Sequence, residues 1–176
     1  MLALIKRYSL QIIFAISVLF GLQLPSFLQQ YEIRLQGHYN EAVLQLEQYQ
    51  SLANLHSSGD LNTLIKEHRE SQSLLFQDEA TVIENKYFRV QGLQQKINYL
   101  DRPIWFRLAI LITEVGQPIF QSTWQSYQAN IVLNQESIIV AIIVAILLML
   151  SLEFLLFLST RFICFLYHHF NKILFA

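Results

Sequence analysis

Two long apolar segments lie near the two ends of this 176-residue chain, and a long, more polar segment separates them. Residues 8–28 and 138–158 are each long enough to cross a bilayer, which takes about 20 apolar residues in a helix. Charged residues make up only 14% of the chain, against about 25% in ordinary soluble domains. Because the apolar excess is concentrated in these two places, the sequence predicts two transmembrane helices rather than an oversized core.

The basic residues predict the orientation of the chain in the membrane. Lys6 and Arg7 precede the first apolar segment, and Arg161 and Lys172 follow the second. Residues 29–136 contain eight basic and twelve acidic residues. Short basic flanks face the cytoplasm under the positive-inside rule. We therefore expect both termini in the cytoplasm and the acidic middle segment on the other side.

A cleaved signal peptide is the competing interpretation of the first apolar segment. Residues 15–17 (Ala-Ile-Ser) have small residues at the spacing of a cleavage site, but cleavage after Ser17 would leave a very short apolar core. Residues 21–25 contain no such pattern. We therefore favour an uncleaved anchor.

The middle segment begins with two helical patterns separated by a short element. Heptad-like apolar spacing predicts a helix over 27–56, carried by Leu35, Tyr39, Ala42, Leu46, Tyr49 and Ala53. A similar stripe predicts a helix over 74–100, carried by Ile83, Tyr87, Val90, Leu93, Ile97 and Leu100. Between them, Asp60 is a suitable N-cap for a short helix. Two long helices of matched length predict an antiparallel hairpin or bundle, with spacing typical of a coiled coil.

Residues 103–128 form a third pattern, which is strongly apolar at its start but too short to span a bilayer. Residues 116–118 (Gly-Gln-Pro) are expected to break or bend it. One interpretation is an interfacial helix, with Trp105 and Trp124 anchored near the lipid headgroups. The other is a third helix in the core of the bundle. The sequence leaves both open.

The predicted fold class is therefore all-α, with two transmembrane helices bracketing an elongated extramembrane helical hairpin or bundle. We expect residues 1–28 to form the cytoplasmic N-terminus and the first transmembrane helix, and residues 29–134 to form a helical domain that is periplasmic if the protein is bacterial. Residues 135–160, capped by Asn134, form the second transmembrane helix. Residues 161–176 form a cytoplasmic amphipathic tail.

Glu153 is an acidic residue inside the second apolar segment. Ionisable groups inside the hydrocarbon are costly and usually have a partner. In an antiparallel pair of spans, Glu153 would lie level with Gln11 and within reach of Arg7 or Lys6. We expect such a contact to tie the two spans together, and the alternative is a glutamate that reaches the aqueous boundary by itself.

Small residues are spaced four apart in both apolar segments. Ser17 and Gly21 form such a pair in the first, and Ala141 and Ala145 form one in the second. Pairs of this kind let membrane helices approach closely. They are candidate helix-packing residues.

No motif in the sequence indicates an enzyme, a metal site or a bound cofactor. His38 with Glu41, and His56 with Asp60, have helical spacing, but a di-iron bundle needs Glu-x-x-His, which occurs nowhere here. We interpret these histidines, and His68, as surface or bundle-edge residues. A net charge of −1 without a basic run gives no sign of nucleic-acid binding.

One stretch of the chain resembles a known family. It comprises residues 21–27 (Gly-Leu-Gln-Leu-Pro-Ser-Phe), then Gln30-Tyr31, Arg34-Leu35, Gly37-His38, Glu41-Ala42, and Gly59-Asp60-Leu61 with Leu64-Ile65 and His68. These residues resemble the first part of a proteobacterial membrane-protein family known only as domain of unknown function 2937. The resemblance implies an inner-membrane location in a Gram-negative bacterium. It implies no activity and assigns no functional residues.

These features favour a non-enzymatic role. We expect a membrane-anchored interaction or scaffold subunit of the cell envelope, in contact with the lipid bilayer, that binds itself or another membrane or periplasmic protein through its helical stalk. A homo-oligomer fits the heptad-like stripes. The alternatives are a sensory or regulatory module acting through a partner membrane protein, and a metal-binding envelope protein.

Overall fold

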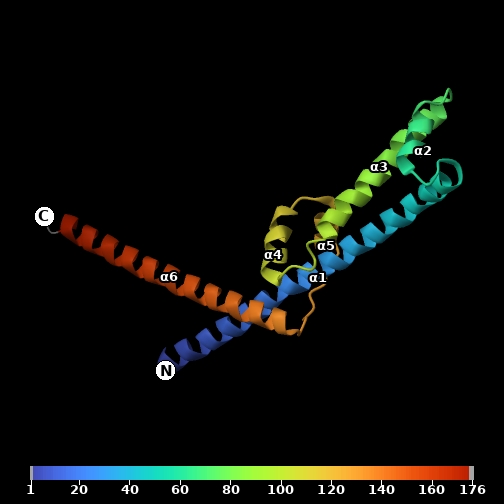
Figure 1. The fold of residues 1–176 in the computed structure, drawn as a ribbon. Coiled ribbons are helices and arrows are strands. Elements are labelled where there is room, and N and C mark those ends of the chain that lie inside the picture. Colours follow the sequence, from blue (N-terminus) through green and yellow to red (C-terminus); the bar gives the residue numbers. More distant parts are fainter. Residues whose placement is uncertain (1, 175–176) are drawn as a thin grey trace. The chain divides into compact units, whose positions relative to one another are not determined.

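The computed structural model describes residues 2–174, and all regular secondary structure in that range is helical (Figure 1). The helices are α1 (Leu2–His56), α2 (Leu61–Arg69), α3 (Leu74–Ile97), α4 (Ile104–Thr113), α5 (Pro118–Gln125) and α6 (Gln135–Leu174). The side chains of residues 2, 3, 5, 6, 9, 156 and 162–174 lie outside the description. The predicted all-α class is confirmed for the described chain, whereas the side chains of the predicted amphipathic tail, 161–176, lie outside it after Arg161.

The first and last helices contain the long apolar stretches. Among the described residues, the helical ranges Leu10–His56 and Gln135–Arg161 each contain a stretch long and apolar enough to cross a membrane. Helix α1 continues through Pro25, although proline removes one backbone hydrogen bond and crowds the carbonyl four residues earlier. Residue 21, whose carbonyl is crowded, is a glycine.

The turn between α1 and α2 follows from its sequence. Ser58 and Gly59 have φ values of 54° and 84°, and the Gly59 amide donates to the Ala53 carbonyl at 2.9 Å. This bond spans one residue more than the 6→1 bond of a Schellman motif, and it ends α1 through two consecutive left-handed residues. The Asp60 carboxylate then accepts from the backbone amides of Asn62 and Thr63, at 3.1 Å each. The predicted N-cap is confirmed.

The other boundaries agree with the predicted breaks to within a turn. Helix α3 ends at Ile97 rather than at residue 100, because the chain tightens into turns before Pro103. Gly116, with φ of 92°, separates α4 from α5, so the apolar region 103–128 is two short helices. The Ser137 amide donates to Asn134 Oδ1 at 2.7 Å, which confirms the predicted cap of α6.

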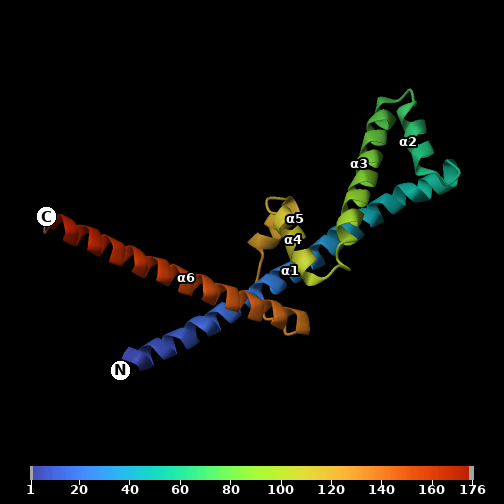
Figure 2. The same cartoon turned by 60° about the vertical axis from the view of Figure 1, so that its left-hand side comes forward.

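The chain divides into two compact units. The first contains residues 1–27 and 128–176, and the second contains Leu28–Tyr127. In the first unit, α1 and α6 cross (Figure 1 and Figure 2), and small residues are buried where they meet. A Cβ atom built on Gly21 would lie 2.9 Å from the Cα and carbonyl oxygen of Ala141. The two backbones are therefore in direct contact there.

In the second unit, α2 lies beside the first half of α3 and the end of α1 (Figure 2). We call the buried residues of this region the tip cluster: Ala53, Leu61, Leu64, Ile65, Ala80 and Ile83. Further along α3, Lys86 Nζ donates to Gln45 Oε1 at 2.6 Å, and the Arg89 guanidinium donates to Glu41 at 2.7 Å. The apolar stripes predicted on α1 and α3 are the buried or half-buried sides of both helices.

Candidate functional site

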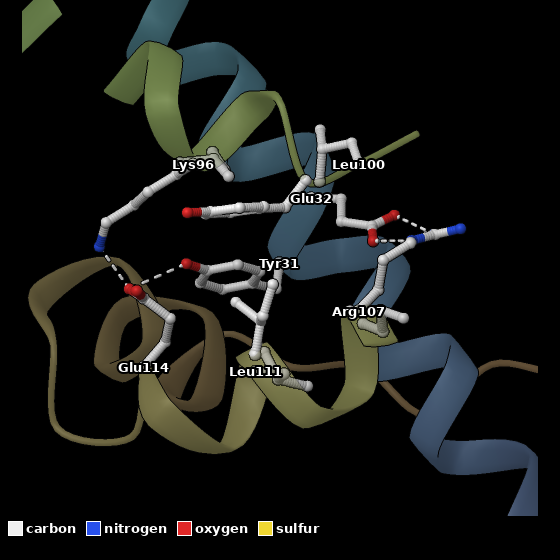
Figure 3. A pocket seen from close by; sticks show the side chains of 11 residues that line it. Tyr31, Glu32, Lys96, Leu100, Arg107, Leu111 and Glu114 are labelled. Atoms are coloured by element: carbon white, nitrogen blue, oxygen red, sulfur yellow. Dashed lines mark hydrogen bonds and ion pairs between the residues drawn. The ribbon is translucent and has the colours of Figure 1, made fainter. Parts of the chain in front are cut away.

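Helix α4 packs against α1 and the end of α3 around a small, largely apolar pocket (Figure 3). The pocket is lined by Leu28, Tyr31, Glu32, Leu35, Lys96, Tyr99, Leu100, Arg107, Ile110, Leu111 and Glu114. Its volume of about 20 Å³ is enough for a single water molecule. Small-molecule sites usually need at least about 300 Å³. The pocket is therefore a packing junction and not a ligand site.

The first polar contact of this junction joins α4 to α1. The Arg107 guanidinium donates from Nε to Glu32 Oε1 at 2.7 Å, and its terminal nitrogen donates to Glu32 Oε2 at 2.6 Å (Figure 3). The two side chains are 21% and 14% exposed. A bidentate pair of this kind has fixed geometry as well as charge. It orients α4 about its own axis relative to α1.

The second polar contact joins three helices through one carboxylate. The Tyr31 hydroxyl of α1 donates to Glu114 Oε2 at 3.1 Å, and the Lys96 ammonium of α3 donates to the same oxygen (Figure 3). Glu114 follows directly after α4 and its side chain is 13% exposed. Its position depends on the C-terminal end of α4, whereas Arg107 lies near the start of that helix. Both ends of α4 are therefore held.

The electrostatics of the junction oppose acid–base chemistry. Burial, followed by the negative charge of Glu114, raises the pKa of Tyr31 above its usual value, so the phenol stays protonated and remains a donor. A general acid or base works best with a pKa near the operating pH. The two carboxylates are balanced by two cations, and no buried side-chain N or O atom in the described residues lacks a hydrogen-bond partner. The arrangement holds helices together.

We call Tyr31, Glu32, Lys96, Arg107 and Glu114 the clamp. The clamp is not predicted by the sequence, although Arg107 is the one charged residue in the apolar run of residues 104–112. A lone charge in such a run implies a buried partner. Nothing in the sequence indicates which of the twelve acids in residues 29–136 that partner is.

The small residues of the two apolar helices lie together in the first unit. Ser17, Gly21, Ala141 and Ala145 are all buried, and the contact is closest between Gly21 and Ala141. Polar side chains lie at one edge of the same unit, where the Ser26 hydroxyl donates to Asn130. The small residues therefore occupy the crossing of α1 and α6.

The structure shows no contact between the polar residues predicted to join the two apolar helices. Glu153, Gln11 and Arg7 are all exposed, and among the described side chains no hydrogen bond or ion pair joins Glu153 to either of the others. The side chain of Lys6 lies outside the described residues. The tie between the spans stays a prediction.

Two residues considered for a metal site, His68 and Glu41, have other partners in the structure. His68 is held by the Leu64 carbonyl at 2.9 Å from Nδ1, faces Glu79 at 3.8 Å, and meets the edge of Phe76. Glu41 binds Arg89, not a histidine. Among the residues that the structure describes, no three His, Cys, Asp or Glu side chains are grouped as a metal ion would require.

A comparison with models of known protein families identifies the family to which this chain belongs. The model described as "Protein of unknown function (DUF2937)" matches residues 5–163. The match extends well beyond the first 100 residues and covers all the elements from α1 to most of α6. No curated protein and no solved structure matches this chain. The chain therefore belongs to the DUF2937 family of proteins of unknown function.

Proposed function

We propose that this protein is a membrane-anchored, non-enzymatic interaction subunit of the bacterial cell envelope. Parts of α1 and α6 cross the inner membrane, both termini lie in the cytoplasm, and the second unit lies in the periplasm. The antiparallel pairing of α1 with α3 forms the stalk that binds a second copy or another envelope protein. The clamp gives this stalk a fixed shape at its base.

Apolar side chains exposed on the second unit carry the proposal. Leu55, at the end of α1, is 75% exposed, and Leu74 and Leu75, at the start of α3, are 76% and 73% exposed. In the sequence, Leu55 precedes α2 and the other two follow it, so all three are distant in sequence from the clamp. Large apolar residues that are exposed on a polar helical unit are typical of surfaces that bind another protein. We call these three residues the tip surface.

An open groove adjoins the same region. It has a volume of about 370 Å³ and is lined by Leu52, His56, Leu64, Glu67, His68, Ser71 and Phe76. Grooves of this kind accept one apolar side chain or a short helix of a partner when exposed apolar residues surround them. The groove and the tip surface are therefore the two candidate regions for protein contact around α2.

Photo-crosslinking in intact membranes tests the proposal. A photoreactive amino acid replaces Leu55 or Leu75 in the full-length chain, and a matched probe replaces Gln95, an exposed polar residue of α3. We expect discrete adducts from the two tip positions and none from the control. An adduct of twice the 20.6 kDa chain mass identifies a second copy, and any other mass is assigned by mass spectrometry.

A competing substitution makes this experiment decisive. With the probe at Leu55, the substitution Leu75→Asp places a charge on the tip surface and is expected to remove the adduct. Labelling that is equal at all three positions, or that survives Leu75→Asp unchanged, contradicts the proposal. Circular dichroism of the variant verifies that the helices are retained.

The groove also favours a second candidate function. Its volume lies within the range of small-molecule sites, and it presents two histidines and a glutamate among apolar side chains. This is the sensory alternative, in which a ligand bound at the tip is reported to a partner membrane protein. A small-molecule screen that raises the melting temperature of the purified protein, but not of its Phe76→Ala variant, would favour it over the scaffold.

A further inference from the structure

Helix α4 has two apolar sides, and only one of them is covered by protein. Ile104 and Leu111 are both 8% exposed, and Leu111 lines the pocket that α4 forms with α1 and the end of α3. Trp105, Phe106 and Ile112 lie on other sides of the same helix and are 47%, 47% and 73% exposed. We call these three residues the outer side of α4. A short helix that is apolar on both sides is unsuited to water on either.

The clamp determines where this outer side lies along α1. Arg107 binds Glu32, and Glu114 binds Tyr31. Glu32 is four residues beyond Leu28, the last residue of the predicted first span, and four residues of α-helix rise about 6 Å. If α1 leaves the hydrocarbon near Leu28, α4 is therefore held at the depth of the lipid headgroups.

The chemistry of α4 suits that depth. Tryptophan is enriched at membrane–water interfaces, where its apolar ring and polar N–H are both accommodated. The one charged residue within α4, Arg107, is already paired inside the clamp. Beside the helix, Asp101 and Arg102 are exposed and of opposite sign, and the Arg102 guanidinium lies 6.0 Å from the centre of the Phe106 ring. The attraction to lipid is thus apolar rather than electrostatic.

We propose that the outer side of α4 is a lipid-docking surface that lies in the headgroup region of the membrane crossed by α1 and α6. This inference rests on the membrane crossing proposed above, but not on any partner of the tip. It concerns α4 and not the whole of 103–128, because the exposed residues beside Trp124 on α5 include Gln121 and Gln125. In this proposal, the bundle interpretation applies to the buried side of α4 and the interfacial interpretation applies to its outer side.

The two tryptophans of the chain make the surface directly measurable. The variant Trp124→Phe leaves Trp105 as the only indole in the full-length protein, which is reconstituted in phosphatidylcholine vesicles. Lipids brominated at shallow or deep acyl positions then report depth by quenching. We expect blue-shifted Trp105 emission, quenched several-fold more strongly by shallow bromines than by deep ones and only weakly by aqueous iodide.

A second tryptophan probe on α4 and a control probe far from α4 test whether the quenching pattern is specific to the outer side. In a tryptophan-free background (Trp105→Phe with Trp124→Phe), Ile112→Trp is expected to repeat the pattern of Trp105. Leu75→Trp in the same background, on the tip surface, is expected to be quenched by iodide and not by brominated lipid. Adding anionic lipid to the vesicles should change neither profile, because Asp101 offsets Arg102.

Each contrary result has a definite meaning. Trp105 emission that is quenched by iodide alone places α4 in water and overturns the docking surface. Protection from both quenchers shows that protein covers α4, and also overturns it. Failure of the protein to float with the vesicles removes the membrane crossing and this inference together. Loss of crosslinks at the tip, with lipid quenching intact, removes only the proposed partner binding.

Discussion

The clamp and the tip cluster both hold α3 against its neighbours, but by different physical means. In the clamp, four charged side chains from α1, α3 and the α4 region are taken partly out of water and paired with one another. In the tip cluster, two alanines and four branched aliphatic residues exclude water by close packing. The charges near the tip, such as Arg69 and Glu84, lie on the surface.

This difference has consequences for how each region tolerates change. A buried ion pair contributes little net stability, yet removing one partner leaves an uncompensated charge. The stability of a packed aliphatic cluster depends mainly on the volume of its side chains, because the cluster has no charges to compensate. We therefore expect the clamp to be sensitive to single substitutions and tolerant of paired ones. The tip cluster should not show such rescue.

The largest effect is expected for Arg107→Met. The substitution keeps the stem of the side chain but leaves Glu32 buried without a cation, which should lower the free energy of unfolding by about 3–5 kcal/mol. Chemical unfolding in mixed micelles, followed by circular dichroism, measures the change. The double variant Glu32→Leu/Arg107→Met should recover most of it.

The matched control is the same substitution at an exposed pair. The side chains of Arg69 and Glu84 are 55% and 36% exposed. Arg69→Met breaks their contact and should lower the free energy of unfolding by less than about 1 kcal/mol. Equal losses of stability in Arg107→Met and Arg69→Met would contradict the burial of the Arg107–Glu32 pair.

The next largest effect is expected in the tip cluster. Ile83 is fully buried, so Ile83→Ala leaves a cavity and should lower the free energy of unfolding by about 3 kcal/mol. Val82→Ala, one position away on a side that is 45% exposed, should cost much less. The same micelle assay measures both, and similar losses at the two positions would contradict the burial of Ile83.

A smaller effect is expected for Tyr31→Phe within the clamp. It removes one hydrogen bond to Glu114 but leaves the contact with Lys96, and should cost about 1–2 kcal/mol. Because the pKa of Tyr31 is raised, its phenol should ionise at a higher pH than an unperturbed phenol in a spectroscopic alkaline titration. This late ionisation should be absent from Tyr31→Phe.

The smallest effect is expected at the cap of α2. Hydrogen bonds from the Thr63 hydroxyl and the Asn62 amide hold the pKa of Asp60 below its ordinary value of 3.8. Its contribution to stability is therefore complete above the ordinary value and is lost as the pH falls through the lowered one. Asp60→Asn keeps an N-cap that does not titrate. Melting temperatures measured between neutral and acidic pH should fall less in this variant than in the wild type.

Local features of this fold were predictable from the sequence because their causes are local. Asp60 and Asn134 cap the helices that follow them, and Gly116 divides α4 from α5. The apolar stripes on α1 and α3 predicted the sides that are buried. The clamp was not predictable, because Arg107 and Glu32 are 75 residues apart. Their pairing depends on the register in which α4 meets α1, which no short-range pattern encodes.

The distribution of the clamp over the chain has a consequence for biosynthesis. Glu32 and Lys96 emerge from the ribosome before the two residues that neutralise them, Arg107 and Glu114. Until the segment around α4 is made, Glu32 on α1 and Lys96 on α3 lack the partners that they have in the folded junction. Both pairs then form when that one segment docks. A nascent chain arrested before residue 104 should accordingly remain open to proteases, whereas one long enough for residue 114 to have left the ribosome should become resistant.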